Sequence, residues 1–193
     1  GGIYIVCSVL AGSTNGLLRV SGGSGSASGA PGGGGRIAVI YNTTKQASYG
    51  DPGVRMQATA GTGGFRGPAQ DGTVYLPDTQ FVASPIRRQH FINCLLYLGS
   101  LTNINYSSLI VSNASFVFAN TSIVVTVTND VSVHAGGLGV GVYGQFICGG
   151  SMQMKNTSTF YAYAGATNIT HPQYGGLVAV TGGVVVGTNC WVY

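Results

Sequence analysis

The chain has 193 residues, of which only 6% are charged, and eight basic residues against four acidic ones give a formal net charge of +4. An ordinary soluble domain has about 25% charged residues, and charged residues normally fill the exposed face of a helix, so this composition argues against a helical protein. The bases are scattered, which argues against a nucleic-acid interface. No apolar run reaches the roughly 18 residues of a membrane-spanning helix.

Short runs of alternating apolar residues, bounded by Gly, Asn, Asp or Pro, predict strands along the whole chain. We expect strands at residues 3–10, 17–20, 36–41, 54–58, 73–76, 91–98, 108–111, 115–118, 123–128, 131–134, 139–143, 145–148, 152–154, 159–163, 177–180, 184–186 and 191–193. Strands this short and closely spaced favour a coiled β architecture over a sandwich.

A glycine-dense run near the N-terminus, from Gly22 to Gly35, contains no large side chain. It is too long for one corner between strands, so we interpret it as a loop or an irregular glycine-packed segment. The strand-like run Arg36 to Tyr41 follows it directly.

The region 51–105 fits the strand pattern least, because it carries four prolines and the adjacent bases Arg87 and Arg88. We interpret it as a candidate lateral insertion within a single domain, 1–193, and as a segment able to carry binding.

The second half of the chain repeats apolar alternation followed by Asn or Gly in steps of roughly seven to nine residues, so that three steps make a rung of about 20–25 residues. This pattern predicts an all-β fold, a parallel β-helix (solenoid) of about eight short rungs with Gly-rich loops. Strict alternation places one set of side chains inside the coil: Ile123, Val125, Val127, Val131 and Val133. It places Thr126, Thr128 and Ser132 outside.

The stretch LAGSTNGLLRVSGGSGSASGAPGGGGRIAVIY resembles a motif of very long, repetitive bacterial surface proteins, in which a glycine run is closed by G-G-R-I-A-x-x-Y. Residues Gly33 to Tyr41 carry that closure, and TVTNDVSVHAGGLGVG and GGLVAVTGGVVVGTNCWVY resemble the rungs that follow it. The resemblance covers most of the chain outside roughly Asp51 to Asn105. It implies a secreted or surface-displayed β-helix, although such repeats are usually poor in cysteine and this chain has four.

Residue patterns for catalysis, cofactor binding and metal binding are weak. Four aspartates stand far apart, and the histidines His90, His134 and His171 have no ligand spacing. The glycine clusters precede strands and match no phosphate-binding loop. We therefore expect no catalytic residue, no cofactor and no metal, and we interpret Asp51, Asp78 and Asp130 as turn residues.

Four widely spaced cysteines and six Asn-x-Ser/Thr sequons are typical of an oxidising, extracellular setting. The candidate disulfide residues are Cys7, Cys94, Cys148 and Cys190, which allow three pairings. One arrangement joins Cys7 to Cys190 between copies and Cys94 to Cys148 within a copy. The candidate glycosylation sites are Asn42, Asn105, Asn113, Asn120, Asn156 and Asn168.

Both ends of the sequence fall inside strand-like patterns, without a charge before Arg19 or after Lys155. Uncapped β-helix ends pair readily with further strands, so we expect either a fibre subunit that assembles head-to-tail with copies of itself or a segment of a longer β-helix. The expected function is a non-enzymatic extracellular scaffold, sheath or adhesin. The alternative is a carbohydrate-binding or carbohydrate-degrading β-helix, for which the candidate sugar-stacking residues are Tyr161, Tyr163, Tyr174, Trp191 and Tyr193.

Overall fold

The structure of the protein is a computed structural model that describes all residues except 27, 51, 64–68, 87–89 and 164–174. Strands account for 42% of it and helices for 6%, and the strand pairs within each set described below are parallel. The predicted all-β class with parallel sheets is therefore confirmed. The chain divides into two compact units, Gly1–Phe81 with Arg88–Gly99 and Val82–Arg87 with Ser100–Tyr193.

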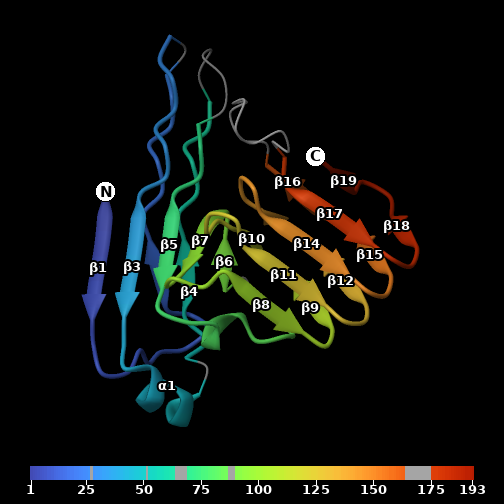
Figure 1. The fold of residues 1–193 in the computed structure, drawn as a ribbon. Coiled ribbons are helices and arrows are strands. Elements are labelled where there is room, and N and C mark those ends of the chain that lie inside the picture. Colours follow the sequence, from blue (N-terminus) through green and yellow to red (C-terminus); the bar gives the residue numbers. More distant parts are fainter. Residues whose placement is uncertain (27, 51, 64–68, 87–89, 164–174) are drawn as a thin grey trace, which may run out of the picture. The chain divides into compact units, whose positions relative to one another are not determined.

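In the first unit, two sets of parallel strands are built from segments far apart in the sequence (Figure 1). One set pairs in the order β1 (Gly2–Val6), β3 (Arg36–Ile40), β5 (Thr73–Leu76) and β7 (Cys94–Leu98). The other pairs in the order β2 (Leu17–Arg19), β4 (Arg55–Gln57) and β6 (Phe91–Ile92). Strands from within 51–105 thus pair in register with strands from the first 40 residues.

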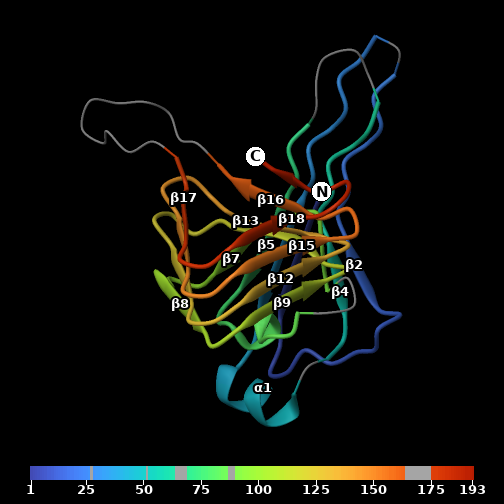
Figure 2. The ribbon, with the colours of Figure 1, turned by 90° about the vertical axis from the view of Figure 1, so that its right-hand side faces the viewer.

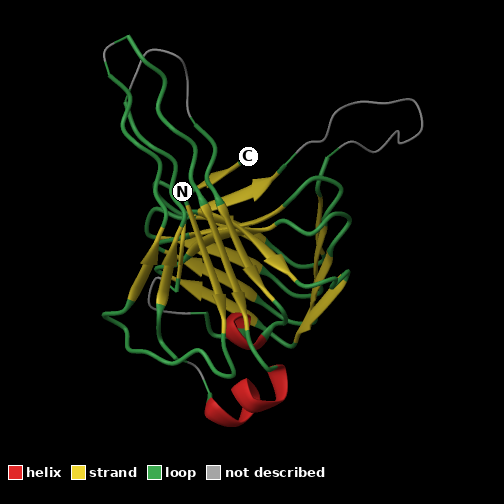
Figure 3. Cartoon of the chain, turned by 90° about the vertical axis from the view of Figure 1, so that its left-hand side faces the viewer, coloured by secondary structure: helices red, strands yellow, loops and turns green. Residues whose placement is uncertain are grey.

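The low helix content agrees with the prediction, but one seven-residue helix, α1 (Thr43–Tyr49), was not predicted (Figure 3). Asn42 caps it, since its side-chain oxygen accepts a hydrogen bond from the Lys45 backbone N–H at 2.9 Å. Its only buried residue is Gln46, so the helix has no apolar stripe that a periodicity search would detect. A short 3₁₀ helix, η1, spans Gln80–Val82.

Two glycine-rich loops, of which the structure describes residues 22–26 with 28–35 and residues 58–63 with 69–72, extend side by side beyond β3 and β5 and form what we call the glycine arm (Figure 1). The Gly22 N–H donates to the Thr59 carbonyl and the Gly25 N–H to the Thr62 carbonyl, both at 2.9 Å. Hydrogen bonds at every third residue are typical of extended chains with three residues per turn rather than of a β-sheet.

The interior of the glycine arm is made of backbone, because the segments approach too closely for side chains. A Cβ atom on Gly22 would lie 2.1 Å from the Gly32 oxygen, and one on Gly61 would lie 1.9 Å from the Gly23 oxygen. The expected glycine-packed loop is therefore present, and its partner is a second glycine-rich loop.

In the second unit, each strand pairs with the third strand after it along the chain (Figure 2). The first set is β8 (Asn103–Tyr106), β11 (Val124–Val127), β14 (Gln145–Cys148) and β17 (Leu177–Val180). The second set is β9 (Leu109–Ser112), β12 (Val131–His134), β15 (Met152–Lys155) and β18 (Val184–Val186). The third set is β10 (Ser115–Phe118), β13 (Gly137–Val140), β16 (Thr159–Ala162) and β19 (Trp191–Val192).

The core of the second unit consists of stacked inward side chains, as the alternation predicts. The five residues predicted to face inward are fully buried: Ile123, Val125, Val127, Val131 and Val133. Thr128 is exposed, and Thr126 and Ser132 are half-buried on the outer face. Successive strands place Ile104, Val125 and Phe146 in one buried column.

Strand boundaries differ from the prediction where turns interrupt the apolar pattern. The run 91–98 is split into β6 and β7 at Asn93, which has a φ of 45°. Strand β8 was not predicted, because Ile104 is its one buried residue and asparagines flank it. Of the helices in the described residues, none has the length and apolarity that crossing a bilayer requires.

Candidate functional site

Three tyrosines gather on the outer face of the second unit, and we call them the tyrosine cluster: Tyr161, Tyr163 and Tyr193. Phe160 is fully buried, so its neighbour Tyr161 faces outward from β16. The rings of Tyr161 and Tyr193 stack with centroids 5.9 Å apart and an interplanar angle of 14°. The Tyr163 ring centroid is also 5.9 Å from that of Tyr161, and the two ring planes are tilted by 31°.

Two glycines of the neighbouring strand β13 make room for the central ring. Gly139 lies directly opposite Tyr161 in the strand register, and a Cβ atom on Gly139 would lie 2.8 Å from the Tyr161 Cβ. The ring leans toward Gly137, whose Cβ position would be 3.6 Å from its Cε2 atom. The sequence GLGV thus provides a surface without side chains on which Tyr161 packs.

The sugar-stacking candidates are partly accessible to solvent. Tyr193 is 69% exposed, Tyr163 45% and Trp191 44%. Trp191 stands two residues before Tyr193, so it leaves the strand on the same side. The structure therefore brings Tyr161, Tyr163 and Tyr193 together and places Trp191 on β19, two residues before Tyr193, whereas Tyr174 lies outside the described residues.

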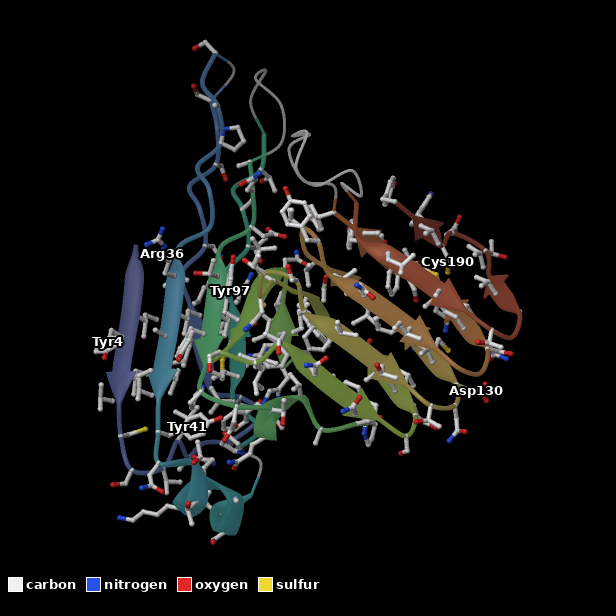
Figure 4. All side chains as sticks on the ribbon, in the orientation of Figure 1. Tyr4, Arg36, Tyr41, Tyr97, Asp130 and Cys190 are labelled. Atoms are coloured by element: carbon white, nitrogen blue, oxygen red, sulfur yellow. The ribbon has the colours of Figure 1, made fainter. Side chains whose placement is uncertain are left out.

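The first unit carries outward tyrosines that the sequence analysis missed. Tyr75 of β5 lies opposite Tyr97 of β7, and Tyr4 of β1 lies opposite Ala38. Figure 4 labels Tyr4 and Tyr97 in that unit. Strict alternation with buried Val74, Leu76, Leu96 and Leu98 was the signal that could have identified Tyr75 and Tyr97.

The final strands of the second unit form an open end. Strands β17, β18 and β19 each pair on one edge only among the described residues, which leaves backbone donors and acceptors unpaired on the other edge. Large apolar side chains are exposed there: Leu177, Val184, Val185, Val186, Trp191, Val192 and Tyr193. In the first unit β1 and β2 are likewise terminal strands, with Tyr4 73% and Val6 65% exposed on β1.

All four cysteines are free in the structure, so the Cys94 to Cys148 disulfide expected within a copy is not formed. Burial raises the pKa of the Cys94 thiol well above its usual value. The Cys148 thiol donates to the Asn129 carbonyl at 3.3 Å, and the Cys190 sulfur accepts from the Ser158 N–H at 3.4 Å. The cysteines therefore behave as buried packing residues, except for the half-exposed Cys7.

Four of the six sequon asparagines are exposed, namely Asn42, Asn105, Asn113 and Asn156. Asn120 is only 8% exposed, and its side-chain amide donates to the Leu101 carbonyl at 3.0 Å. Asn120 is therefore buried, unlike the other four sequon asparagines in the described residues. Asn168 lies outside the described residues.

The described aspartates hold local structure. Asp78 accepts hydrogen bonds from the Tyr41 hydroxyl at 2.6 Å and from the Gln80 N–H at 3.0 Å. Asp130 accepts from the Ser151 N–H at 2.8 Å. Asp71 accepts from the Ala60 N–H at 2.7 Å, while partial burial raises the pKa of its carboxyl. Within the part of the chain that the structure describes, no three His, Cys, Asp or Glu side chains gather as metal ligands would.

The histidines lie in separate environments. His90 is buried between aromatic rings, stacked on Phe81 at 5.9 Å and edge-on to Phe91 at 5.5 Å. His134 is on the outer face of β12, with its Nε2 atom 2.7 Å from the Asn156 side-chain nitrogen. His171 lies outside the described residues.

Comparison of the chain with protein-family models, with curated proteins and with solved structures gives no match.

Proposed function

We propose that the protein is a non-enzymatic structural protein, a parallel β-helix of about eight short rungs that serves as a subunit of an extracellular surface fibre, sheath or adhesin. The parallel pairing of every third strand in the second unit supports the coil. The longest set of paired strands has four members in each unit, which supports about eight rungs in total. The resemblance of Gly33–Tyr41 to repetitive surface proteins supports the extracellular setting.

The observation that carries this proposal is the open end of the second unit. Val184, Val186 and Val192 continue the inward columns of the buried Met152, Met154 and Phe160, yet each is about half exposed. An edge with unpaired backbone groups and exposed core side chains binds another strand unless a charge or a cap blocks it. The strand that continues there comes either from a longer β-helix of the same chain or from a second copy, and a second copy makes a head-to-tail contact that propagates into a filament.

Negative-stain microscopy of the purified protein tests the proposal directly. We expect filaments with an axial repeat of about 40 Å, the height of eight rungs. The variant Val186→Lys places a charge on the open end and is expected to abolish them, because lysine on an edge strand opposes pairing.

Ile110→Lys is the matched control, since Ile110 is an exposed aliphatic residue on the outer face of β9. Discrete particles for the native protein, or equal filaments for both variants, would contradict head-to-tail assembly at this end. Shortening of the filaments by a reducing agent would identify a bond between Cys7 and Cys190 of neighbouring copies.

The second candidate function is carbohydrate binding, and the tyrosine cluster is the observation that favours it. Exposed aromatic rings on a rigid sheet face provide stacking surfaces.

Glycosylation at Asn42, Asn105, Asn113 and Asn156 is a further proposal, and intact-mass measurement of the protein secreted from a glycosylating host tests it.

A further inference from the structure

The outer face of strands β13, β16 and β19 combines aromatic rings with an absence of charge. The residues at its outward positions are Gly137, Gly139, Thr159, Tyr161, Trp191 and Tyr193. Ionic groups are lacking from these positions, and hydroxyl groups stand at Thr159 and on each tyrosine. Two of the six residues are glycines, so the rings lie close to the backbone of the sheet.

We propose that this face, with Tyr163 beside it, binds a chain of an uncharged polysaccharide, a proposal that rests on the second candidate function. The C–H face of a sugar ring is apolar and packs against an aromatic ring, while the tyrosine and threonine hydroxyls donate and accept hydrogen bonds at the sugar's edge. An acidic polysaccharide would bring carboxylates or sulfates to a face without a compensating base, and desolvating such charges is costly.

The arrangement of the rings favours a chain over a single sugar. Tyr161 and Tyr193 stand on neighbouring strands with ring centroids 5.9 Å apart, and Tyr163 adds a third ring at the same distance from Tyr161. Tyr163, Trp191 and Tyr193, which are 44–69% exposed, therefore offer more than one ring to a bound chain, and Tyr161 is the ring on which both other tyrosines pack. Packing of Tyr161 against Gly137 and Gly139 holds the central ring before a ligand arrives, which lowers the entropic cost of binding.

The chain has one tryptophan, Trp191, and its fluorescence reports binding at this face without a label. The experiment titrates the native protein with soluble oligosaccharides of cellulose, chitin and mannan, and with heparin as an acidic comparison. We expect at least one neutral oligosaccharide to change the emission of Trp191, with an affinity that is the same at about 0.05 M and about 0.5 M salt, because charge screening does not affect an uncharged ligand.

Substitutions at the central ring distinguish stacking from other contacts. We expect Tyr161→Ala to bind about fivefold to tenfold more weakly, the loss typical of one aromatic contact. Tyr161→Phe keeps the ring and is expected to bind within about twofold of the native protein. Tyr49→Ala is the matched control, since Tyr49 is a 59% exposed tyrosine on α1, and it is expected to leave binding unchanged.

Absence of any response to the neutral oligosaccharides overturns the proposal, and so does native-like binding by Tyr161→Ala with an unchanged circular-dichroism spectrum. Binding of heparin alone, lost at high salt, also overturns it by showing that charge directs the interaction. If Tyr161→Ala does not fold, Tyr193→Ala, which removes the 69% exposed ring stacked on Tyr161, takes its place: weaker binding supports the proposal, and native binding contradicts it. Filament formation is observed by negative-stain microscopy of the same samples. A protein that fails to bind polysaccharide can therefore be distinguished from one that fails to assemble head-to-tail.

Discussion

Gly34 in the glycine arm is required by contact between backbones and not by an unusual backbone angle. A Cβ atom on Gly34 would lie 2.0 Å from the Ala58 oxygen and 2.3 Å from the Gly72 nitrogen. Gly23, eleven residues earlier in the same loop, has no atom within 4 Å of its Cβ position. Two glycines that look alike in the sequence therefore have different roles.

We expect Gly34→Ala to lower the free energy of unfolding by about 1–3 kcal/mol, because the new methyl group must displace backbone atoms. Gly23→Ala is expected to be neutral or slightly stabilising, since it reduces the freedom of the unfolded chain. Urea unfolding of both variants measures the difference. Equal stability of the two would show that the two loops do not pack closely.

The buried Tyr41 hydroxyl donates to Asp78, and burial together with this contact raises the pKa of Tyr41 far above its ordinary 10.0. Burial also raises the pKa of Tyr106, whose hydroxyl donates to the Val82 carbonyl at 3.0 Å. Above pH 10 the unfolded chain loses these protons while the folded chain keeps them. The unfolded state then binds fewer protons, so the free energy of unfolding falls as pH rises.

We expect Tyr41→Phe and Tyr106→Phe each to reduce this decline. The measurement is urea unfolding at intervals between about pH 8 and about pH 11, compared with the native protein. A decline of native size in both variants would mean that other groups, such as the buried Cys94 thiol, cause it.

Among the elements, α1 shows how a polar residue can anchor a helix to a β protein. The Gln46 side chain accepts from the Leu10 N–H at 2.8 Å and donates to the carbonyls of Leu10 at 3.2 Å and Gly50 at 3.0 Å. These bonds satisfy the backbone of the segment between β1 and β2, which lacks a strand partner at Leu10. The helix is therefore fixed by hydrogen bonds rather than by an apolar face.

We expect Gln46→Ala to lower the free energy of unfolding by about 1–3 kcal/mol, the cost of leaving buried backbone groups unsatisfied. Lys45→Ala, at the exposed neighbouring position, is the matched control and is expected to change stability by less than about 0.5 kcal/mol. Thermal unfolding of the two variants measures the effect. Native melting temperatures for both would mean that the hydrogen bonds of the Gln46 side chain do not contribute to stability.

Over the whole molecule, stability comes from stacked strands and not from covalent links. The cysteines are free, and three of the four are buried. A disulfide typically adds about 2–4 kcal/mol to the free energy of unfolding, and a reducing agent removes that contribution. A protein without a disulfide therefore keeps its stability when it is reduced.

We expect a reducing agent to change the melting temperature of the dispersed protein by less than about 1 °C, far below the shift that loss of a disulfide causes. An alkylating reagent applied to the native protein should label Cys7 first, because the other three thiols are shielded. Mass spectrometry of the labelled protein measures both the number and the order of free thiols. A large fall in melting temperature on reduction would show that a disulfide forms in solution.

Part of this fold and of its candidate site was predictable from local pattern. Alternation identified the inward column from Ile123 to Val133, and it also predicts that Tyr161 faces away from Phe160, because successive side chains on a strand point to opposite faces. The same pattern could not find α1, whose buried residue is polar, or β8, whose single inward residue stands between asparagines.

The sequence by itself determined the class of the protein: short strands and an apolar core follow from the period of its apolar residues, which is a property of neighbouring positions. Parallel pairing follows from the repeat of that pattern in rungs of about 20–25 residues. Tertiary structure alone decided which segments meet. It brought Tyr193 onto Tyr161 across 32 positions, joined the two loops of the glycine arm, divided the chain into two units and left the four cysteines free. These outcomes depend on register and on distances between remote backbones, and no local pattern of residues encodes a distance through space.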